Sequence, residues 1–163
     1  KIFGELMMLI ESDHRGEKIT LAYNGMPFYV PENLYIIGMM NTADRSLAML
    51  DYALRRRFSF FTMKPGFNAP GFQAYQDSLK SDDFNKLIAC VKQLNSKIAE
   101  DISLGEGFCI GHSYFCGLTP ETTNAQTLSS IVEYELIPLL KEYWFDEPAK
   151  IIDWSDRLRS AVK

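Results

Sequence analysis

The sequence is poor in the residues that build metal centres and disulfide frameworks. It has three cysteines and two histidines in 163 residues, and no cysteine pair has the Cys-x-x-Cys spacing. A structural zinc site needs metal-ligand spacing of that kind, and a small secreted scaffold needs an even, patterned cysteine set. Neither class fits, so we expect no metal site. Cys90, Cys109 and Cys116 are expected to be reduced thiols, as in a cytoplasmic protein.

Long apolar runs and a strong excess of one charge are also missing. No run of about 18 apolar residues occurs, so a membrane span is not expected. The formal net charge of −4 argues against a surface that holds duplex nucleic acid by phosphate neutralisation alone. With 47% hydrophobic and 23% charged residues, the composition is that of an ordinary globular protein.

The first eleven residues predict a helix that has no start signal. Apolar side chains at positions 3, 6, 7 and 10 share one helical face, and no Ser, Thr, Asp or Asn precedes them to cap the first turn. The chain also begins with Lys1 rather than Met. We therefore expect the chain to be part of a longer protein.

Residues 19–63 predict an α/β arrangement. Two alternating runs flank Asn24-Gly25, which predicts a β-hairpin with a type I′ turn. The continuous apolar run at 34–40 predicts a strand buried on both faces of a parallel sheet. A helix over 45–56 and a second strand over 58–63 are expected to follow.

Beyond the linker-like residues 65–71, the pattern is helical. Helices are expected over 82–101, capped by Ser81, over 125–144 and over 148–162. Pro138 lies inside the second of these and predicts a kink or a break. The fold class is therefore α/β plus all-α, and the basic-to-acidic balance shifts from 8:7 in residues 1–67 to 9:14 in residues 68–163.

Two polar clusters of the first part are candidate site residues. Asn41 and Asp44 follow the strand at 34–40, and ligands of open α/β sheets bind beyond the carboxyl ends of strands. The alternative is that one of them caps the following helix. Arg55, Arg56 and Arg57 end that helix, either as a solvated basic edge or as a source of guanidinium groups for phosphate.

The loop at 105–115 is the third candidate. Gly111, His112 and Ser113 could open a short helix whose N-terminus faces an anion. A structural, hydrogen-bonded His112 is the alternative interpretation. The phosphate-loop pattern G-x-x-x-x-G-K-[ST] is absent from the sequence.

Together these residues resemble the second half of the AAA+ motor of the McrB family, the GTP-hydrolysing subunits of modification-dependent restriction systems. The resemblance covers nearly the whole chain, and its motifs lie at residues 3–5, 29–38, 40–46 (Met-Asn-Thr-Ala-Asp-Arg-Ser), 52–58, 107–115 and 137–144. It implies the end of an AAA+ α/β core at 1–66 and a helical lid at 67–163.

The resemblance also implies roles for the candidate residues. Asn41 would be the sensor-1 residue that reads the γ-phosphate and positions water, with Asp44 in the family's signature loop. Arg57 would be the arginine finger, exposed to solvent in a monomer, with Arg56 beside it. The nucleotide-facing residues would be Arg45 and, at the sensor-2 position, Gly111, His112 and Ser113.

The cofactors and partners follow from the same resemblance. GTP and Mg²⁺ would bind the longer protein through elements that precede Lys1, and this chain alone would bind neither. The expected partners are like subunits in a ring, with six as the expected number, an McrC-like endonuclease, and DNA contacted through other domains. Two alternatives stay open: a helical interaction module with a small α/β cap and no nucleotide chemistry, or an AAA+ protein that uses ATP.

Overall fold

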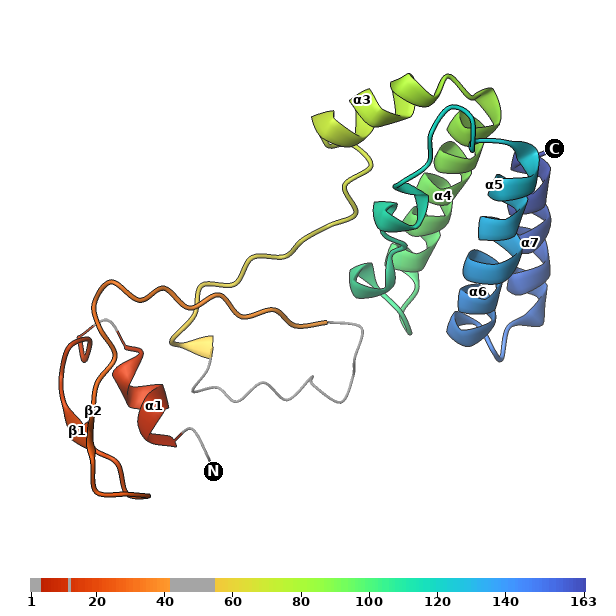
Figure 1. Ribbon diagram of the computed structural model, residues 1–163. Helices are drawn as coiled ribbons and strands as arrows, with labels where there is room; N and C mark the ends of the chain where they lie inside the picture. The colour runs from red at the N-terminus through yellow and green to blue at the C-terminus, as the bar shows by residue number, and fades with distance from the viewer. Residues whose placement is uncertain (1–3, 12, 42–54) are drawn as a thin grey trace. The chain divides into compact units, whose positions relative to one another are not determined.

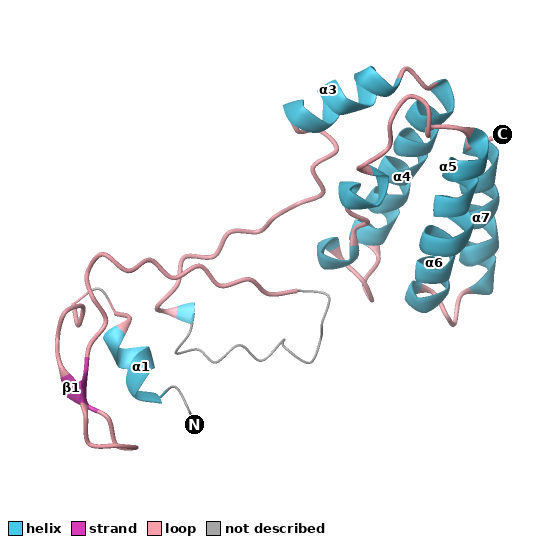
Figure 2. Ribbon diagram, in the orientation of Figure 1, coloured by secondary structure: helices cyan, strands magenta, loops and turns pink. Residues whose placement is uncertain are grey.

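The computed structural model describes residues 4–11, 13–41 and 55–163, and the side chains from residue 7 onward within them (Figure 1). The chain divides into two compact units, Lys1–Thr62 and Met63–Lys163. Figure 2 shows that helices dominate the second unit, whereas most of the described first unit is loop. No helix in the described ranges is long and apolar enough to cross a membrane.

The first unit contains a short helix and a small antiparallel hairpin. Helix α1 spans Gly4–Leu9, and strands β1 (Ile19–Thr20) and β2 (Pro27–Phe28) pair with Ile19 opposite Phe28. The predicted helix at the chain start and the predicted hairpin are therefore both confirmed in the described residues. Leu9, Ile10 and Val30 are the buried apolar side chains described in this unit.

The turn of the hairpin differs from the predicted one. A type I′ turn needs a positive φ at both central residues, but here Gly25 has φ +67° and Asn24 does not lie in that region. The Leu21 amide donates to the Met26 carbonyl at 2.9 Å, which leaves four residues in the loop. Asn24 instead accepts the Met26 amide through Oδ1 at 3.0 Å, an Asx-type contact that replaces the tight turn.

The two predicted parallel strands are not formed in this chain. Residues 34–40 are exposed throughout, with Ile37 90% and Met39 97% exposed, and residues 58–63 include Phe61 at 88%. Neither segment has a strand beside it among the described residues, where β1 and β2 are the one paired set. A strand of a parallel sheet is stabilised by its neighbours, so an apolar run without them remains an extended loop.

The predicted helix at 45–56 lies almost wholly outside the described residues. Asp44 and Arg45 lie outside them too. Of the candidate site residues in the first unit, the structure therefore places Asn41, Arg56 and Arg57.

The second unit is helical, as predicted. Its elements are α3 (Pro70–Leu79), α4 (Asp82–Glu100), η2 (Glu106–Phe108), η3 (His112–Phe115), α5 (Ala125–Ile131), η4 (Val132–Leu136), α6 (Ile137–Tyr143) and α7 (Pro148–Ala161). Helix α4 packs along α7, and α6 packs against α7 as well (Figure 1). Their apolar faces enclose one core of 21 buried residues.

Helix α4 begins where the sequence predicts. The Ser81 side chain accepts the Phe84 amide at 3.2 Å, and Asp82 and Asp83 occupy the first turn, where a negative charge favours the helix dipole. The predicted apolar face is buried along its whole length, at Phe84, Leu87, Ile88, Val91, Leu94 and Ile98.

The predicted interruption at Pro138 takes the form of a π-helical turn. Pro138 has no N–H for the carbonyl of Tyr134, and its ring would clash with that carbonyl in a regular α-helix. Segment η4 widens the helix directly before α6, and the Ile137 amide donates to Val132, five residues back. The helical run over α5, η4 and α6 thus continues past the proline with a changed hydrogen-bond pattern.

Candidate functional site

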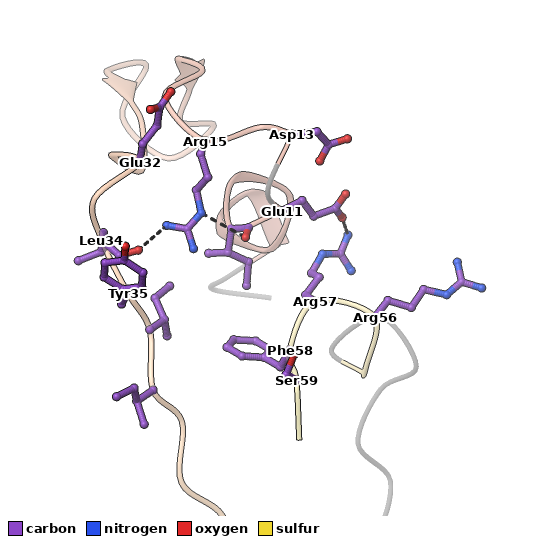
Figure 3. A pocket seen from close by; sticks show the side chains of 13 residues that line it. Glu11, Asp13, Arg15, Glu32, Leu34, Tyr35, Arg56, Arg57, Phe58 and Ser59 are labelled. Carbon is purple, nitrogen blue, oxygen red and sulfur yellow. Dashed lines mark hydrogen bonds and ion pairs between the residues drawn. The ribbon is translucent and has the colours of Figure 1, made fainter. Parts of the chain in front are cut away.

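The described candidate residues of the first unit lie on two segments that are separated by the undescribed residues 42–54. Asn41 is exposed at the end of the extended residues 34–41. Arg56 and Arg57 follow the undescribed stretch and line a cavity of about 1420 Å³ (Figure 3). Asn41 does not line that cavity, so the structure brings the two arginines together there without it.

Arg57 points to the carboxylate of Glu11, which follows α1, and forms an ion pair with it (Figure 3). Its side chain is 19% exposed. The expectation that Arg57 faces solvent in a monomer is therefore wrong. The partner lies far away in the sequence, and both residues line the same cavity.

Arg56 has a different orientation from its neighbour. Its side chain is exposed and extends away from Glu11 (Figure 3). Consecutive residues at a helix end point in different directions, so the side chains of Arg56 and Arg57 diverge. Of the two, Arg56 presents its charge outward.

Among the described residues that line the cavity, positive and negative side chains are balanced. The charged side chains that line it are three cations, Arg15, Arg56 and Arg57, and three carboxylates, Glu11, Asp13 and Glu32. Arg15 donates to the carbonyl of Ile10 at 3.3 Å and to that of Leu34 at 2.9 Å. Because Arg15 and Arg57 already have partners, a phosphate group would have to displace these contacts to bind here.

An acidic cluster at the end of α1 escaped the sequence reasoning. Potential ligand atoms of Glu11, Asp13 and His14 lie within 4.8 Å of one another. Glu11 pairs with Arg57, and His14 Nδ1 lies 2.8 Å from Glu17 Oε2, a hydrogen bond that raises the pKa of His14. Glu11 and His14 therefore each have a protein partner.

In the second unit, His112 opens the four-residue helix η3 after Gly111, as the sequence predicts. The Gly66 amide donates to His112 Nδ1 at 3.0 Å, so the hydrogen of this tautomer is on Nε2. The ring packs edge-on against Phe67 and Phe72, with centroid distances of 6.2 and 5.6 Å. Ser113 is exposed beside it. These contacts agree with the structural interpretation of His112.

Asn95 positions the loop that leads to His112, and sequence reasoning missed it. Its Nδ2 donates to the Ile110 carbonyl at 2.9 Å, and its Oδ1 accepts the Ile110 amide at 2.7 Å. The side chain thus mimics a β-strand partner and holds Ile110 at 1% exposure. The signal in the sequence was a polar Asn directly after the buried Leu94, at the edge of the apolar face of α4.

Comparisons with known proteins match both the helical unit and the chain as a whole. Residues 86–152 match the family model described as "McrB, alpha-helical lid domain". The "Type IV methyl-directed restriction enzyme EcoKMcrB subunit" of Escherichia coli (strain K12) is 48% identical over 171 residues, which cover 97% of this chain. The chain is McrB-like. The match includes the first unit as well as the helical one, and the predicted resemblance is confirmed.

A second relative is more distant. The McrB-like chain is 29% identical over 128 residues to the "Type II restriction enzyme BsuMI component YdiS" of Bacillus subtilis (strain 168), which covers 66% of this chain. The chain spans 37% of the length of each of these two relatives.

Proposed function

We propose that this McrB-like chain is part of the motor subunit of a modification-dependent restriction system. In that role an AAA+ ring of like subunits, six in number, hydrolyses GTP with Mg²⁺ and drives DNA translocation for an McrC-like endonuclease. The observation that carries the proposal is 48% identity to a methyl-directed restriction subunit over 97% of the chain. The domain division, with an α/β end before the lid, belongs to the same proposal.

The exposed apolar segments of the first unit support an incomplete α/β core. Residues 34–40 and 58–63 have the apolar composition of sheet strands, yet most of their side chains are exposed. In a longer McrB-like protein, neighbouring strands would cover both segments and satisfy their backbone groups. The phosphate-binding loop and the acidic residues for Mg²⁺ would belong to that same additional part.

The site residues keep their proposed roles. Asn41 would orient the attacking water from the end of its strand, and Asp44 and Arg45 would follow in the signature loop. An oriented water is a transition-state interaction, so Asn41→Ala should lower kcat far more than it weakens nucleotide binding. Gly111, His112 and Ser113 would lie on the lid side, where the Nε2–H of His112 is the donor that its ring can offer.

Arg56 and Arg57 are the two candidates for the finger residue. A finger that acts on the neighbouring subunit must reach outward, and Arg56 does so in this structure. Arg57 would have to leave Glu11 first. Both arginines therefore remain candidates: Arg57 occupies the position that matches the finger and would act once its pair with Glu11 opens on assembly, and Arg56 lies beside it and points outward.

The test uses the longer McrB-like protein and mixes inactive variants. Each of Arg56→Ala and Arg57→Ala is combined with a second variant that lacks the phosphate-loop Lys, and GTP hydrolysis is measured in mixed rings. Loss of a finger should lower hydrolysis by about 10³-fold or more. Activity that returns on mixing identifies the residue that acts across the interface, because some interfaces then combine an intact loop with an intact finger.

Glu11→Gln separates the two assignments. If Arg57 is the finger, releasing it from Glu11 should leave hydrolysis intact or raise it. If Arg57 only holds the helix end, Glu11→Gln should resemble Arg57→Ala. Mixtures that co-assemble but stay inactive at every ratio would contradict a finger role for either arginine.

A further inference from the structure

The chain that enters the helical unit is fastened to it before the first helix begins. Lys64 Nζ donates to Glu106 Oε1 at 3.0 Å, the Gly66 amide to His112 Nδ1 at 3.0 Å, and Lys92 Nζ to Asn68 Oδ1 at 2.9 Å. Three successive points of residues 64–68 are therefore held by three different parts of the unit. We call residues 64–68 the strap.

Phe67 anchors the strap in the core. It is 3% exposed and belongs to the buried core cluster. Its ring meets Phe72 edge-on at 5.4 Å and lies 5.9 Å from Phe115. Burying an aromatic side chain to this extent requires an ordered backbone around it, and that order costs conformational entropy. Residues 66–68 are therefore a fixed part of the helical unit and not a mobile linker.

Gly66 and His112 fit each other closely. A Cβ atom on Gly66 would lie 3.0 Å from Cε1 and 3.2 Å from both ring nitrogens of His112. Only a residue without a side chain lets the backbone approach the imidazole so closely. The hydrogen bond and the ring contacts of His112 thus hold the strap from one side while Phe67 enters the core.

The residues directly before the strap contrast with it. Phe60, Phe61 and Met63 are 57%, 88% and 87% exposed, and residues 59–63 have no regular secondary structure. The sequence predicts a linker at residues 65–71, which contain two prolines and two glycines. In the structure, the strap and α3 occupy that stretch.

We propose that His112 is a positioning residue that docks the strap, so that in this 163-residue chain the ordered helical body begins at Lys64 and the pivot lies before it, at residues 59–63. The strap then moves with the helical unit as one body, from Lys64 onward. This inference does not depend on GTP hydrolysis, since every contact that carries it lies within the second unit.

Chymotrypsin tests the inference in the full 163-residue chain, because an aromatic residue lies on each side of the proposed boundary. Proteolysis of a native protein reports the population of locally opened states. We expect cleavage after Phe60 and Phe61 at least tenfold faster than cleavage after Phe67, measured by intact mass spectrometry of the helical fragments. Equal rates would overturn the docked strap.

Three variants test His112 itself. His112→Phe keeps an aromatic ring and removes the acceptor, whereas His112→Asn keeps an acceptor near the position of Nδ1. We expect cleavage after Phe67 to rise about tenfold or more in His112→Phe and in His112→Ala, and less in His112→Asn. Hydrogen exchange of the Gly66 amide should follow the same order, which a general loss of packing would not produce.

Asn124→Ala is the matched control. It removes the side chain that accepts the Thr127 amide at 3.0 Å at the start of α5, away from the strap. It should destabilise the helical unit without changing the rate at Phe67 under native conditions. An unchanged rate at Phe67 in His112→Ala, or an increase in Asn124→Ala as large as that in His112→Phe, would overturn the role of His112.

Discussion

The two units differ in how much of their apolar surface they bury with their own residues. The helical unit buries 21 apolar residues in one core, whereas the described part of the first unit buries Leu9, Ile10 and Val30 and exposes most of its apolar strand-like segments. A helix completes its hydrogen bonds within one segment, but a strand depends on neighbours. The helical unit is therefore a folded body by itself, whereas the apolar segments of the first unit have no neighbouring strand among the described residues.

The largest test of this contrast uses one residue type in both units. Ile98 is 0% exposed on α4 and Ile37 is 90% exposed on the segment 34–40. Ile98→Ala should lower the free energy of unfolding by about 2–5 kcal/mol, because it leaves a cavity in a packed core. Ile37→Ala should change it by less than about 0.5 kcal/mol.

Urea denaturation of the chain, followed by circular dichroism, measures both effects. If the two variants lose stability equally, Ile37 lies in a packed core, and the proposed difference between the units is wrong. If neither loses stability, the helical core is not packed as described.

A middle-sized effect is expected at the junction of α4 with the α6–α7 corner. Asp101 accepts from Ser103 Oγ at 2.6 Å, Trp144 Nε1 at 2.9 Å and Lys150 Nζ at 3.0 Å, and its side chain is 9% exposed. These hydrogen bonds, that of Ser103 first, hold the pKa of Asp101 well below its ordinary value. Asp101→Asn should lower the free energy of unfolding by roughly 2 kcal/mol, because the carboxylate accepts at both oxygens whereas the amide has one acceptor oxygen and one donor NH₂ group.

The contribution of Asp101 to folding stability should also depend on pH. A lowered pKa in the folded state means that Asp101 stabilises the fold above its unfolded pKa of about 3.9. This contribution is lost as the pH falls below about 4, toward the folded pKa. The slope of stability against pH in that range should be shallower in Asp101→Asn. Asn124→Ala, which removes the cap of α5 and no carboxylate, is the control and should keep the wild-type slope.

The smallest effect is expected inside the helical core, at Ser155. It is 4% exposed on α7, and its Oγ has no hydrogen-bond partner in the described part of the chain. Ser155→Ala should therefore be neutral or stabilise the unit by up to about 1 kcal/mol. In the control Ser160→Ala, an exposed hydroxyl that donates to the Asp156 carbonyl is lost, and stability should not rise. Thermal melting that ranks Ser155→Ala below Ser160→Ala would show that the buried hydroxyl has a stabilising partner.

The helical unit could be predicted closely because its signals are local. The cap at Ser81, the apolar face of α4 and the interruption at Pro138 each depend on residues a few positions apart. Even there, the form of the interruption was not predictable, since a π-turn and a kink are two solutions to the same missing N–H.

The candidate site was less predictable because its contacts join distant residues. The pair of Arg57 with Glu11 and the hydrogen bond of Gly66 to His112 have no local pattern. A run of three arginines indicates guanidinium groups, but only the fold decides which one faces outward. The prediction of strands at 34–40 and 58–63 was wrong for the same reason. A strand forms only beside neighbouring strands, and an apolar run of residues does not specify them.

Amide hydrogen exchange along the whole chain tests the central claim most directly. Amides of α4, α6 and α7 should be strongly protected in this chain, while those of residues 34–40 and 58–63 should exchange at nearly the rates of an unfolded peptide. In the longer McrB-like protein, the same two segments should become protected as strands. Protection of residues 34–40 in the 163-residue chain, or continued rapid exchange in the longer protein, would contradict the account.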